Sequence, residues 1–342
     1  LTAIVLPLTR TLLVLMETPP EILDGAYDFI SIIFAGLIVF ILLYLQNCLI
    51  RALGDSKTPT ILLAVTLGIN IALEPVAILV LGWGIPGAAL ATVVSQAIGA
   101  LLFYIYIRWR VPALHTRLSD WKPSGAVLMA HLRMGLPMAF QSSVIAIGAI
   151  ILQVALNNLG ALPVAAYAAT QKIDAVAVMP MLSFGYAMAA YTAQNYGAQK
   201  YERIRMGVRA CLRMSIAFAI GIGILLIAFG THVLALFVGA DAAGAEEVIA
   251  YGQTYLIVNG SMYAVLATLL VYRNVLQGLG QSVIPTIAGA LELIMRAVAA
   301  VFLCGALGFL GACMANPLAW IGAGIPVVLA YFWTEKTLRQ TV

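Results

Sequence analysis

The sequence predicts an all-α membrane protein that crosses the bilayer many times and is built as two pseudo-symmetric helical bundles. Of the 342 residues, 63% are hydrophobic and only 9% are charged, and the mean hydropathy is +1.03. A soluble domain carries about 25% charged residues, so this chain has too few charges to cover a globule in water. Apolar runs recur along the whole chain, and three motifs occur twice. Together these observations predict the fold class.

Each apolar run is long enough to form a helix that crosses the membrane. A bilayer core of about 30 Å requires about 20 apolar helical residues, whereas the strands of a membrane barrel are much shorter. The runs predict ten spans, the first of them represented only by residues 1–8. The other nine cover residues 25–50, 59–82, 86–107, 134–159, 163–190, 209–230, 248–271, 284–305 and 308–333.

The charged residues are distributed unequally between the two sides of this alternating topology. The positive-inside rule makes the basic side cytoplasmic, so we expect the basic loops and the C-terminus on the inner side of a cell (inner) membrane. The net charge of +4 therefore reflects orientation and predicts no nucleic-acid partner. The basic residues of this side are Arg51, Lys57, Arg108, Arg110, Arg117, Lys122, Arg133, Lys200, Arg203, Arg205, Arg209, Arg213, Lys336 and Arg339.

Three motifs occur twice, in the same order and at a nearly constant offset along the chain. AYDFISIIFAG at 26–36 matches AYGQTYLIVNG at 250–260, RALGDSKTPT at 51–60 matches QGLGQSVIPT at 277–286, and GIPGAALAT at 84–92 matches GFLGACMAN at 308–316. The chain therefore contains two homologous halves, an organisation typical of secondary transporters. An even number of spans separates the matched positions, so we expect the halves to run parallel.

The repeat defines the expected domains. An N-lobe over residues 1–110 holds four spans, and a C-lobe over residues 134–342 holds six. A polar connector at 111–133, which contains Pro112 and Pro123, joins them on the cytoplasmic side. The first two spans of the C-lobe have no counterpart in the N-lobe. We therefore expect two further helices ahead of this chain, which would then be an N-terminally truncated fragment of a twelve-helix protein.

Five motifs, taken in their order and spacing, resemble one known family. They are the loop at 51–60, NIALEPVAI at 70–78, GAALATVVSQ at 87–96, MGLPMAFQS at 134–142 and AAYTAQNYGAQKYERI at 189–204. Together they resemble the multidrug and toxic compound extrusion (MATE) family of the MOP flippase superfamily, over essentially the whole chain. The resemblance implies two six-helix lobes and a cavity that opens alternately to either side. It also implies efflux of organic cations or other amphipathic compounds, driven by proton or sodium uptake.

Glu74 is the clearest intramembrane charge of the N-lobe. A charge at the bilayer centre costs about 2.5–3.5 kcal/mol on insertion scales, so such residues are candidates for ion coupling. Pro75 follows it and frees the carbonyl one turn back, and Asn70 lies one turn earlier on the same face. The MATE resemblance adds Thr92 on the next helix and implies a protonatable hydrogen-bond network with an Asp of the missing first helix. Here Glu replaces the more usual Asp, and packing across helices remains an alternative role.

Lys172 and Asp174 lie near the middle of the 163–190 span. Residues at i and i+2 do not face each other on a helix, so each should have its own partner, whereas Gln171 can share a face with Asp174. Both charged residues are candidates for proton or cation sites, and a structural ion pair is the alternative. Gln141 is a further candidate. Some sodium-coupled MATE members carry an acidic residue slightly beyond this position, where the sequence here is SSVIAIG, which favours proton coupling.

Other polar residues of the spans are predicted to be structural. Glu292 and Arg296, at i and i+4, should form an ion pair. Arg273, Asn274 and Gln277 follow the end of the 248–271 run, where we expect cytoplasmic helix-end contacts. Gly221 and Gly223 should serve close helix packing. The four cysteines form no C-x-x-C pair and should be buried free thiols.

The sequence predicts no enzyme. It contains no Walker A loop, no membrane-embedded cluster of nucleophile, base and acid, and no histidine spacing that suits zinc. We expect no catalytic residue, no metal site and no cofactor beyond the coupling ion, H⁺ or Na⁺.

We predict a cation-coupled, proton-driven antiporter in which one chain, a monomer, suffices for transport of small organic cationic or amphipathic substrates. The first alternative is a lipid-linked oligosaccharide flippase, whose cavity should carry several Arg or Lys for pyrophosphate. At membrane depth the sequence offers only Lys172 and Arg296 for that purpose. The second alternative is an inactive, truncated membrane protein.

Overall fold

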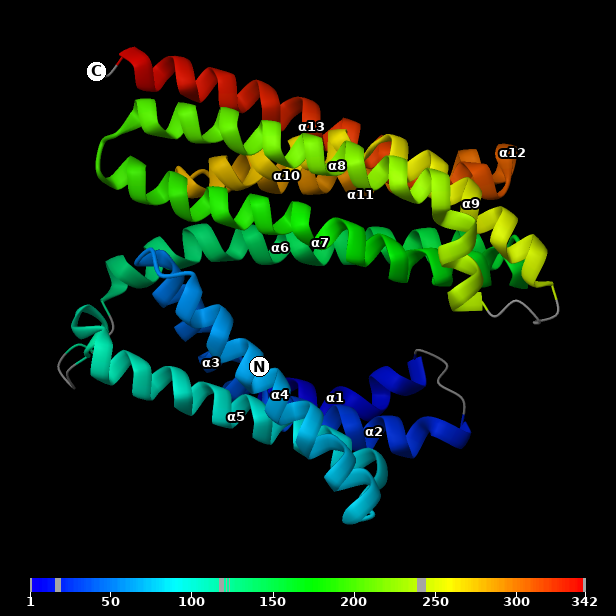
Figure 1. Cartoon of the computed structure of the whole chain (residues 1–342), viewed down its shortest axis with the longest axis horizontal. Helices are drawn as coiled ribbons and strands as arrows, with labels where there is room; N and C mark the ends of the chain where they lie inside the picture. The colour runs from blue at the N-terminus through cyan, green and yellow to red at the C-terminus, as the bar shows by residue number, and fades with distance from the viewer. Residues whose placement is uncertain are drawn as a thin grey trace. The chain divides into compact units, whose positions relative to one another are not determined.

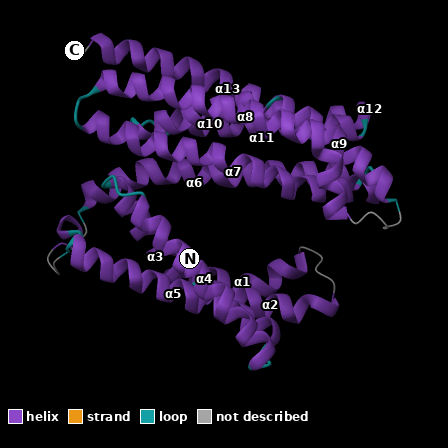
Figure 2. Cartoon of the chain, viewed as in Figure 1, coloured by secondary structure: helices purple, strands orange, loops and turns teal. Residues whose placement is uncertain are grey.

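The computed structural model describes residues 2–15, 20–116, 120, 122, 124–238 and 244–340. Among these residues every regular element is a helix, and no strand occurs (Figure 2). A helix satisfies all of its backbone hydrogen bonds within one segment, which is what a chain dissolved in lipid requires. The all-α, multi-span fold class predicted from the sequence is confirmed.

The chain divides into two compact units, Leu1–Lys122 and Pro123–Val342. The first unit contains α1 (Thr2–Leu15), α2 (Pro20–Ala35), α3 (Leu37–Ala52), α4 (Lys57–Pro75), a π-helical turn (Val76–Val80), α5 (Gly84–Arg110) and a 3-10 turn (Pro112–Leu114). The second contains α6 (Gly125–Asn157), α7 (Ala161–Gly197), α8 (Tyr201–Val238), α9 (Ala245–Ser261), α10 (Tyr263–Gly278), α11 (Val283–Val298), a π-helical turn (Ala299–Leu303), α12 (Cys304–Leu307) and α13 (Phe309–Gln340) (Figure 1).

The boundary between the units falls inside the polar segment 111–133, the predicted connector. Helix α6 begins at Gly125, so residues 125–133 of this segment are helical. They are exposed, and they include Ala, Leu, Met and Arg, which favour helix. The polar character of the segment therefore reflects an exposed first part of a long helix.

Seven of the described helices are long and apolar enough to cross a membrane, and the number is nine if each of two bent pairs counts as one span. These nine coincide with the nine complete apolar runs of the sequence. The tenth run, at residues 1–8, lies within the 14-residue helix α1. One expectation about the cysteines was wrong, because Cys48 is exposed, whereas Cys304 and Cys313 are buried.

The two sequence repeats also share a structural feature, because each unit contains one span that is broken and bent. In the first unit, Ile22–Ala35 and Leu37–Ala52 meet at 49°, and in the second, Ala245–Ser261 and Tyr263–Gly278 meet at 50°. The residues between the helices, Gly36 and Met262, are separated along the chain by the same offset as the matched loops at 51–60 and 277–286. Each unit therefore contains a bent span at nearly the same place in its sequence, since the first matched motif aligns Gly36 with Gly260, two residues before Met262.

The loops of the repeat also share their backbone conformation. Gly54 and Gly280 occupy matched positions and have φ angles of 96° and 79°. Gly84 and Gly308, in the third matched motif, have φ angles of 56° and 59°. An L-residue with a side chain rarely adopts these angles, whereas glycine does so readily. The repeated glycines are therefore explained by the turns that they form.

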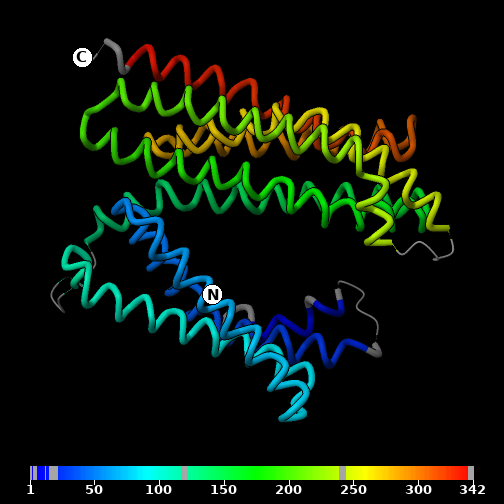
Figure 3. The backbone as a smooth tube through the Cα atoms, in the orientation of Figure 1, coloured from blue at the N-terminus to red at the C-terminus, as the bar shows by residue number. Residues whose placement is uncertain are grey.

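Small residues bring the helices of the second unit close together. A Cβ on Gly223 of α8 would lie 2.5 Å from the carbonyl oxygen of Gly260, so this glycine serves close packing as predicted. A Cβ on Gly221 would meet no atom of the described residues within 4 Å, so that prediction was wrong for Gly221. Gly148 of α6 and Gly185 of α7 similarly face side chains of α11 and α10. Helix α6 packs mainly against α11, and α7 packs mainly against α10; the tube in Figure 3 shows these long helices running along the second unit.

Candidate functional site

A cavity of about 320 Å³ lies within the second unit, among α6, α7, α10, α11 and α13. Its apolar wall is formed largely by leucines of α6, α7 and α10 and by Trp320 of α13. Its polar lining falls into two clusters. We call Asp174 and the hydroxyl and amide groups around it the acidic pole, and Arg273, Glu292 and Arg296 the basic pole.

Asp174 is the centre of the acidic pole. Asp174 is 9% exposed, and its Oδ1 accepts a hydrogen bond of 2.6 Å from the hydroxyl of Tyr263. Tyr263 is the first residue of α10, immediately after the bend at Met262, so the repeated helix break supplies the partner of this acid.

A fully buried tyrosine extends the acidic pole. The hydroxyl oxygen of Tyr255 accepts hydrogen bonds of 3.1 Å from both the Gln171 and the Asn316 side-chain amides. The ring of Tyr167 stands edge-on to that of Tyr255, with centroids 5.7 Å apart. The sequence prediction that Gln171 and Asp174 share a face is confirmed, since both line the cavity. Lys172 does not share it. Lys172 is exposed and lines a separate groove beside Phe237. Lys172 and Asp174 therefore face different sides of α7, as their spacing of two residues predicts.

The basic pole is a carboxylate between two arginines. Arg273 donates from Nη2 to Oε1 of Glu292. Arg296, one turn after Glu292 on α11, places its Nη2 3.9 Å from Oε2 and donates from Nη1 to the carbonyl of Ile145 at 3.3 Å. All three charged residues are at most 9% exposed. The predicted Glu292–Arg296 pair is therefore present, but the closer contact of Glu292 is with Arg273.

The expectation that Arg273 makes a cytoplasmic helix-end contact was wrong. The apolar run ends at residue 271, but α10 continues to Gly278 and residues 269–276 are all buried. Arg273 therefore lies inside the bundle, and Asn274 beside it is also buried. A signal for this was present in the sequence. The stretch YAVLATLLV is apolar on every face, as expected of a central helix, so the polar residues that follow it should also have been placed inside.

Gln141 lies outside the cavity lining. Its side chain is buried and packs against Gly289 of α11, where a Cβ would come within 2.7 Å of Gln141 Cγ. Its Oε1 accepts a hydrogen bond of 3.4 Å from Gln277. The structure thus places Gln141 in a polar contact between α6 and α10, apart from Asp174.

The three candidates of the first unit lie on two packed helices, Asn70 and Glu74 on α4 and Thr92 on α5. The Thr92 hydroxyl donates to the carbonyl of Ala88 within its own helix. The Asn70 Nδ2 is buried and, within the described ranges, has no hydrogen-bond partner. No hydrogen bond joins the three residues in that part of the chain. Pro75 is followed directly by the π-helical turn, which agrees with the expected local opening of this helix.

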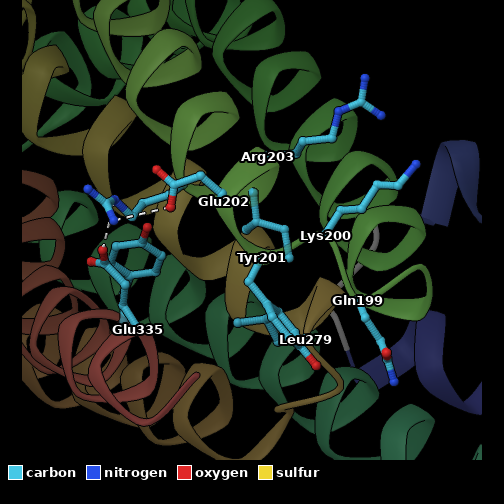
Figure 4. Close-up of a pocket in the computed structure, with 10 residues that line it drawn as sticks. Gln199, Lys200, Tyr201, Glu202, Arg203, Leu279 and Glu335 are labelled. Atoms are coloured by element: carbon cyan, nitrogen blue, oxygen red, sulfur yellow. Dashed lines mark hydrogen bonds and ion pairs between the residues drawn. The ribbon is translucent and has the colours of Figure 1, made fainter. Parts of the chain in front are cut away.

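A second pocket of about 470 Å³ lies at the turn between α7 and α8 (Figure 4). Arg205 stands between two carboxylates there, with Nη1 3.2 Å from Glu202 and Nε 3.4 Å from Glu335 of α13. Lys200 and Arg203 extend to the opposite side from Glu335. The ion pairs connect the start of α8 to the end of α13. No group of three or more His, Cys, Asp or Glu that could hold a metal ion occurs in the segments covered by the structure.

Comparison with known proteins identifies the family. The MatE family model matches residues 1–76 and 137–302. Among curated proteins, the probable multidrug resistance protein YpnP of Bacillus subtilis (strain 168) is 28% identical over 275 residues, which are 80% of this chain and 60% of YpnP. The probable multidrug resistance protein YoeA of the same strain is 30% identical over 236 residues, 67% of this chain and 51% of YoeA. The chain therefore spans little more than half of the length of these relatives.

The fold agrees with that of solved transporters. A crystal structure of MATE in complex with MaL6 superposes with a TM-score of 0.89 at 20% identity, covering 99% of this chain and 76% of that chain. An outward-facing multidrug resistance MATE transporter of the MOP superfamily gives a TM-score of 0.88 at 21% identity, covering 99% and 75%. At these identities the likeness concerns the fold alone. With the family model matched over both units, the chain belongs to the MATE family of multi-pass membrane transporters.

Proposed function

We propose that the protein is a proton-coupled antiporter that exports organic cations or amphipathic compounds by alternating access. The observation that carries this proposal is the buried Asp174 carboxyl group, held by Tyr263 in a cavity with an apolar wall. A buried carboxylate is stable only when it is paired with a cation or neutralised by a proton. Binding of a substrate cation and binding of a proton at Asp174 therefore exclude each other, which is the requirement for exchange.

The rest of the cavity suits an amphipathic cation. Ligand cavities are mostly apolar, with a few polar groups that set orientation, and leucines with Trp320 supply such a wall here. The rings of Tyr167 and Trp320 line the same cavity, and aromatic faces attract organic cations. This combination supports a site for amphipathic cations, in a chain whose relatives are named as multidrug resistance or multidrug export proteins.

The first unit offers a second carboxyl group for coupling. Glu74 is half-buried on α4, directly before Pro75 and the π-helical turn, with Asn70 one turn earlier. In the proposed mechanism Glu74, Asn70 and Thr92 hold a second exchangeable proton. We further propose that the protein acts as a monomer in the inner membrane, with the basic loops and the C-terminus in the cytoplasm.

The test is transport in proteoliposomes. Efflux of a fluorescent organic cation is followed under an imposed proton gradient and, separately, under a sodium gradient. We expect the proton gradient to drive efflux, and Asp174→Asn or Glu74→Gln to abolish it with normal expression. Glu246→Gln, which removes an exposed carboxyl group near the start of α9, is the matched control and should transport normally.

Unchanged efflux in both Asp174→Asn and Glu74→Gln would refute the coupling sites, and efflux driven only by sodium would refute the coupling ion. If neither gradient moves any cation, the flippase alternative gains weight. The sequence argued against a flippase because it offered only Lys172 and Arg296 as cations at membrane depth. In the structure the cations that line the cavity are Arg273 and Arg296, while Lys172 lines a separate groove. Lipid-linked substrates would then be assayed.

A further inference from the structure

We infer that the basic pole of the cavity binds a carboxylate group of a transported amphipath, so that the substrates include aromatic acids as well as cations. This inference rests on the proposed function and adds a substrate class to it. It starts from the composition of the pole, in which two guanidinium groups face one carboxylate. With Glu292 ionised, the pole carries a net charge of +1 among buried residues.

The guanidinium groups have more donors than the protein provides acceptors for. Arginine has five N–H donors in a fixed planar arrangement. Arg273 donates to Glu292, and Arg296 donates to the Ile145 carbonyl and approaches Glu292 only at 3.9 Å. The Nε of each arginine is too deeply buried for a ligand to reach, but both arginines line the cavity. Each makes a single hydrogen bond within the described residues, so its Nη groups keep N–H donors for a ligand that supplies two oxygens.

The chemistry of the pole selects the ligand group. Guanidinium groups bind carboxylates in a bidentate manner, with two parallel N–H···O bonds. Asp174 does not fill this role, because its contact is with Tyr263, the first residue of α10, whereas Arg273 lies ten residues further along that helix. Tyr263 and Arg273 are therefore about 15 Å apart along the axis of α10, at 1.5 Å per residue. Asp174 and Glu292 contact different residues of this helix, so we expect the two poles to bind different groups.

The size and wall of the cavity favour a small aromatic acid. Its volume is about 320 Å³, and Trp320 and the leucines of α10 border it. Such a volume is at the lower end of the range for ligand cavities. A lipid-linked oligosaccharide is much larger than this space. A single aromatic ring with a carboxylate fits both the apolar wall and the basic pole, so benzoate is a suitable probe.

The first experiment measures binding to the purified protein in detergent. Benzoate is titrated against the tryptophan fluorescence, with benzamide as the neutral isostere and benzylammonium as the cationic one, and Trp320→Phe identifies the reporting residue. We expect benzoate to bind more tightly than benzamide and Arg296→Gln to weaken benzoate binding by at least about tenfold. Arg296→Gln leaves the Arg273–Glu292 pair intact, so the variant should fold.

Two controls separate this site from general electrostatics and from the acidic pole. Arg213→Gln makes the same change at an exposed arginine of α8 and should leave benzoate binding unchanged. Asp174→Asn should reduce benzylammonium binding and leave benzoate binding equal or stronger, since it removes a negative charge from the cavity. A loss of benzoate binding in Asp174→Asn that equals the loss in Arg296→Gln would contradict separate poles.

The second experiment uses the opposite substitution. Glu292→Gln frees both guanidinium groups from their internal carboxylate and should lower the thermal unfolding midpoint. Benzoate should raise the midpoint of this variant by more than it raises that of the unmodified protein, because a ligand that binds the folded state stabilises it. A purely structural ion cluster predicts no such recovery.

The inference is overturned if benzoate binds no better than benzamide, if Arg296→Gln does not change its affinity, or if benzoate fails to recover Glu292→Gln. Equally tight, Arg296-dependent binding of inorganic pyrophosphate would overturn the carboxylate assignment in favour of a phosphate site. Because binding is measured without a gradient, these outcomes are independent of proton-coupled export. Benzoate binding with no transport of any compound would refute the proposed function, and with it the statement that aromatic acids are substrates, but it would leave the carboxylate site intact.

Discussion

In the first unit the helix after the repeated loop carries Asn70 and Glu74, whereas in the second unit the corresponding helix carries Glu292 and Arg296. Both helices follow a glycine with positive φ, and both continue into a π-helical turn. The two helices differ in how many partners their polar side chains have. Glu292 contacts two arginines within its own unit, while the Asn70 amide nitrogen has no partner among the described residues.

This difference shows which features the repeat preserves. The turns and bends recur because they depend on glycine and on helix breaks, which set the backbone of each half. The intramembrane charges do not recur, since they depend on side chains that each half can exchange without changing its backbone. The second unit therefore holds a connected polar network, and the first holds polar side chains with unused hydrogen-bonding capacity. The following substitutions test that contrast.

The largest effect should come from the carboxylates. Glu292→Gln leaves two buried guanidinium groups without their carboxylate, and breaking a buried ion pair in this way costs about 3–5 kcal/mol. Glu74→Gln removes a half-buried carboxylate that has no ion pair in the segments covered by the structure, and should cost less than about 1 kcal/mol. Denaturant unfolding in detergent, followed by tryptophan fluorescence, measures both. Equal losses would mean that Glu74 also has a strong partner.

Two asparagines provide a smaller test. Asn259 of α9 is fully buried, and its Nδ2 donates to the carbonyls of Tyr255 and Cys313 at 3.2 Å. Asn259→Leu removes these donors and should cost about 1–3 kcal/mol. Asn70→Leu removes an amide whose nitrogen has no partner in the described part of the chain, and should be nearly neutral for stability. The same unfolding measurement applies. A marked loss in Asn70→Leu would show that packing, rather than coupling, explains this residue.

The turn glycines test what the two units have in common. Gly54→Ala and Gly280→Ala place a Cβ at matched positions with φ of 96° and 79°. Each substitution should cost about 1–2 kcal/mol, because an L side chain is strained at positive φ. Gly68→Ala, in α4 with negative φ and open space around its Cβ, is the control and should be neutral or slightly stabilising. The midpoints of thermal unfolding of the three variants measure these losses. Clearly unequal losses at Gly54 and Gly280 would weaken the structural equivalence of the two loops.

The smallest effect is a pH dependence confined to the first loop. Hydrogen bonds from Thr58 and Tyr106 hold the pKa of Asp55 below its ordinary value. The resulting stabilisation is present above the unfolded-state pKa, about 3.9, and is lost as the pH falls through the lower folded-state value. Gln281, the matched residue, does not titrate. Amide-exchange protection should therefore weaken in acid for residues 53–60 but not for 279–286, and Asp55→Asn should abolish the difference.

The sequence predicted the helical, multi-span architecture well because hydropathy and the repeat depend on residue type alone. It also placed Gln171 and Asp174 on one face and paired Glu292 with Arg296, since helical spacing fixes both relations. It could not provide the partners across helices. Tyr263 meets Asp174 only because α10 restarts at the bend after Met262, and Arg273 meets Glu292 because two helices pack together. Such contacts depend on tertiary geometry, which spacing along one chain segment does not determine.

The paired π-helical turns have a consequence for movement. In each unit the wide turn, Val76–Val80 or Ala299–Leu303, follows a helix that carries intramembrane charges, Glu74 on α4 or Glu292 and Arg296 on α11. Such a turn contains one residue more than an α-helical turn. If it passes from one end of a helix towards the other, every residue that it crosses rotates by about 100° about the axis. Glu74 and Arg296 lie one and two residues before these helices end. Migration of the wide turn by a few residues would therefore redirect both side chains while the rest of each span keeps its hydrogen bonds.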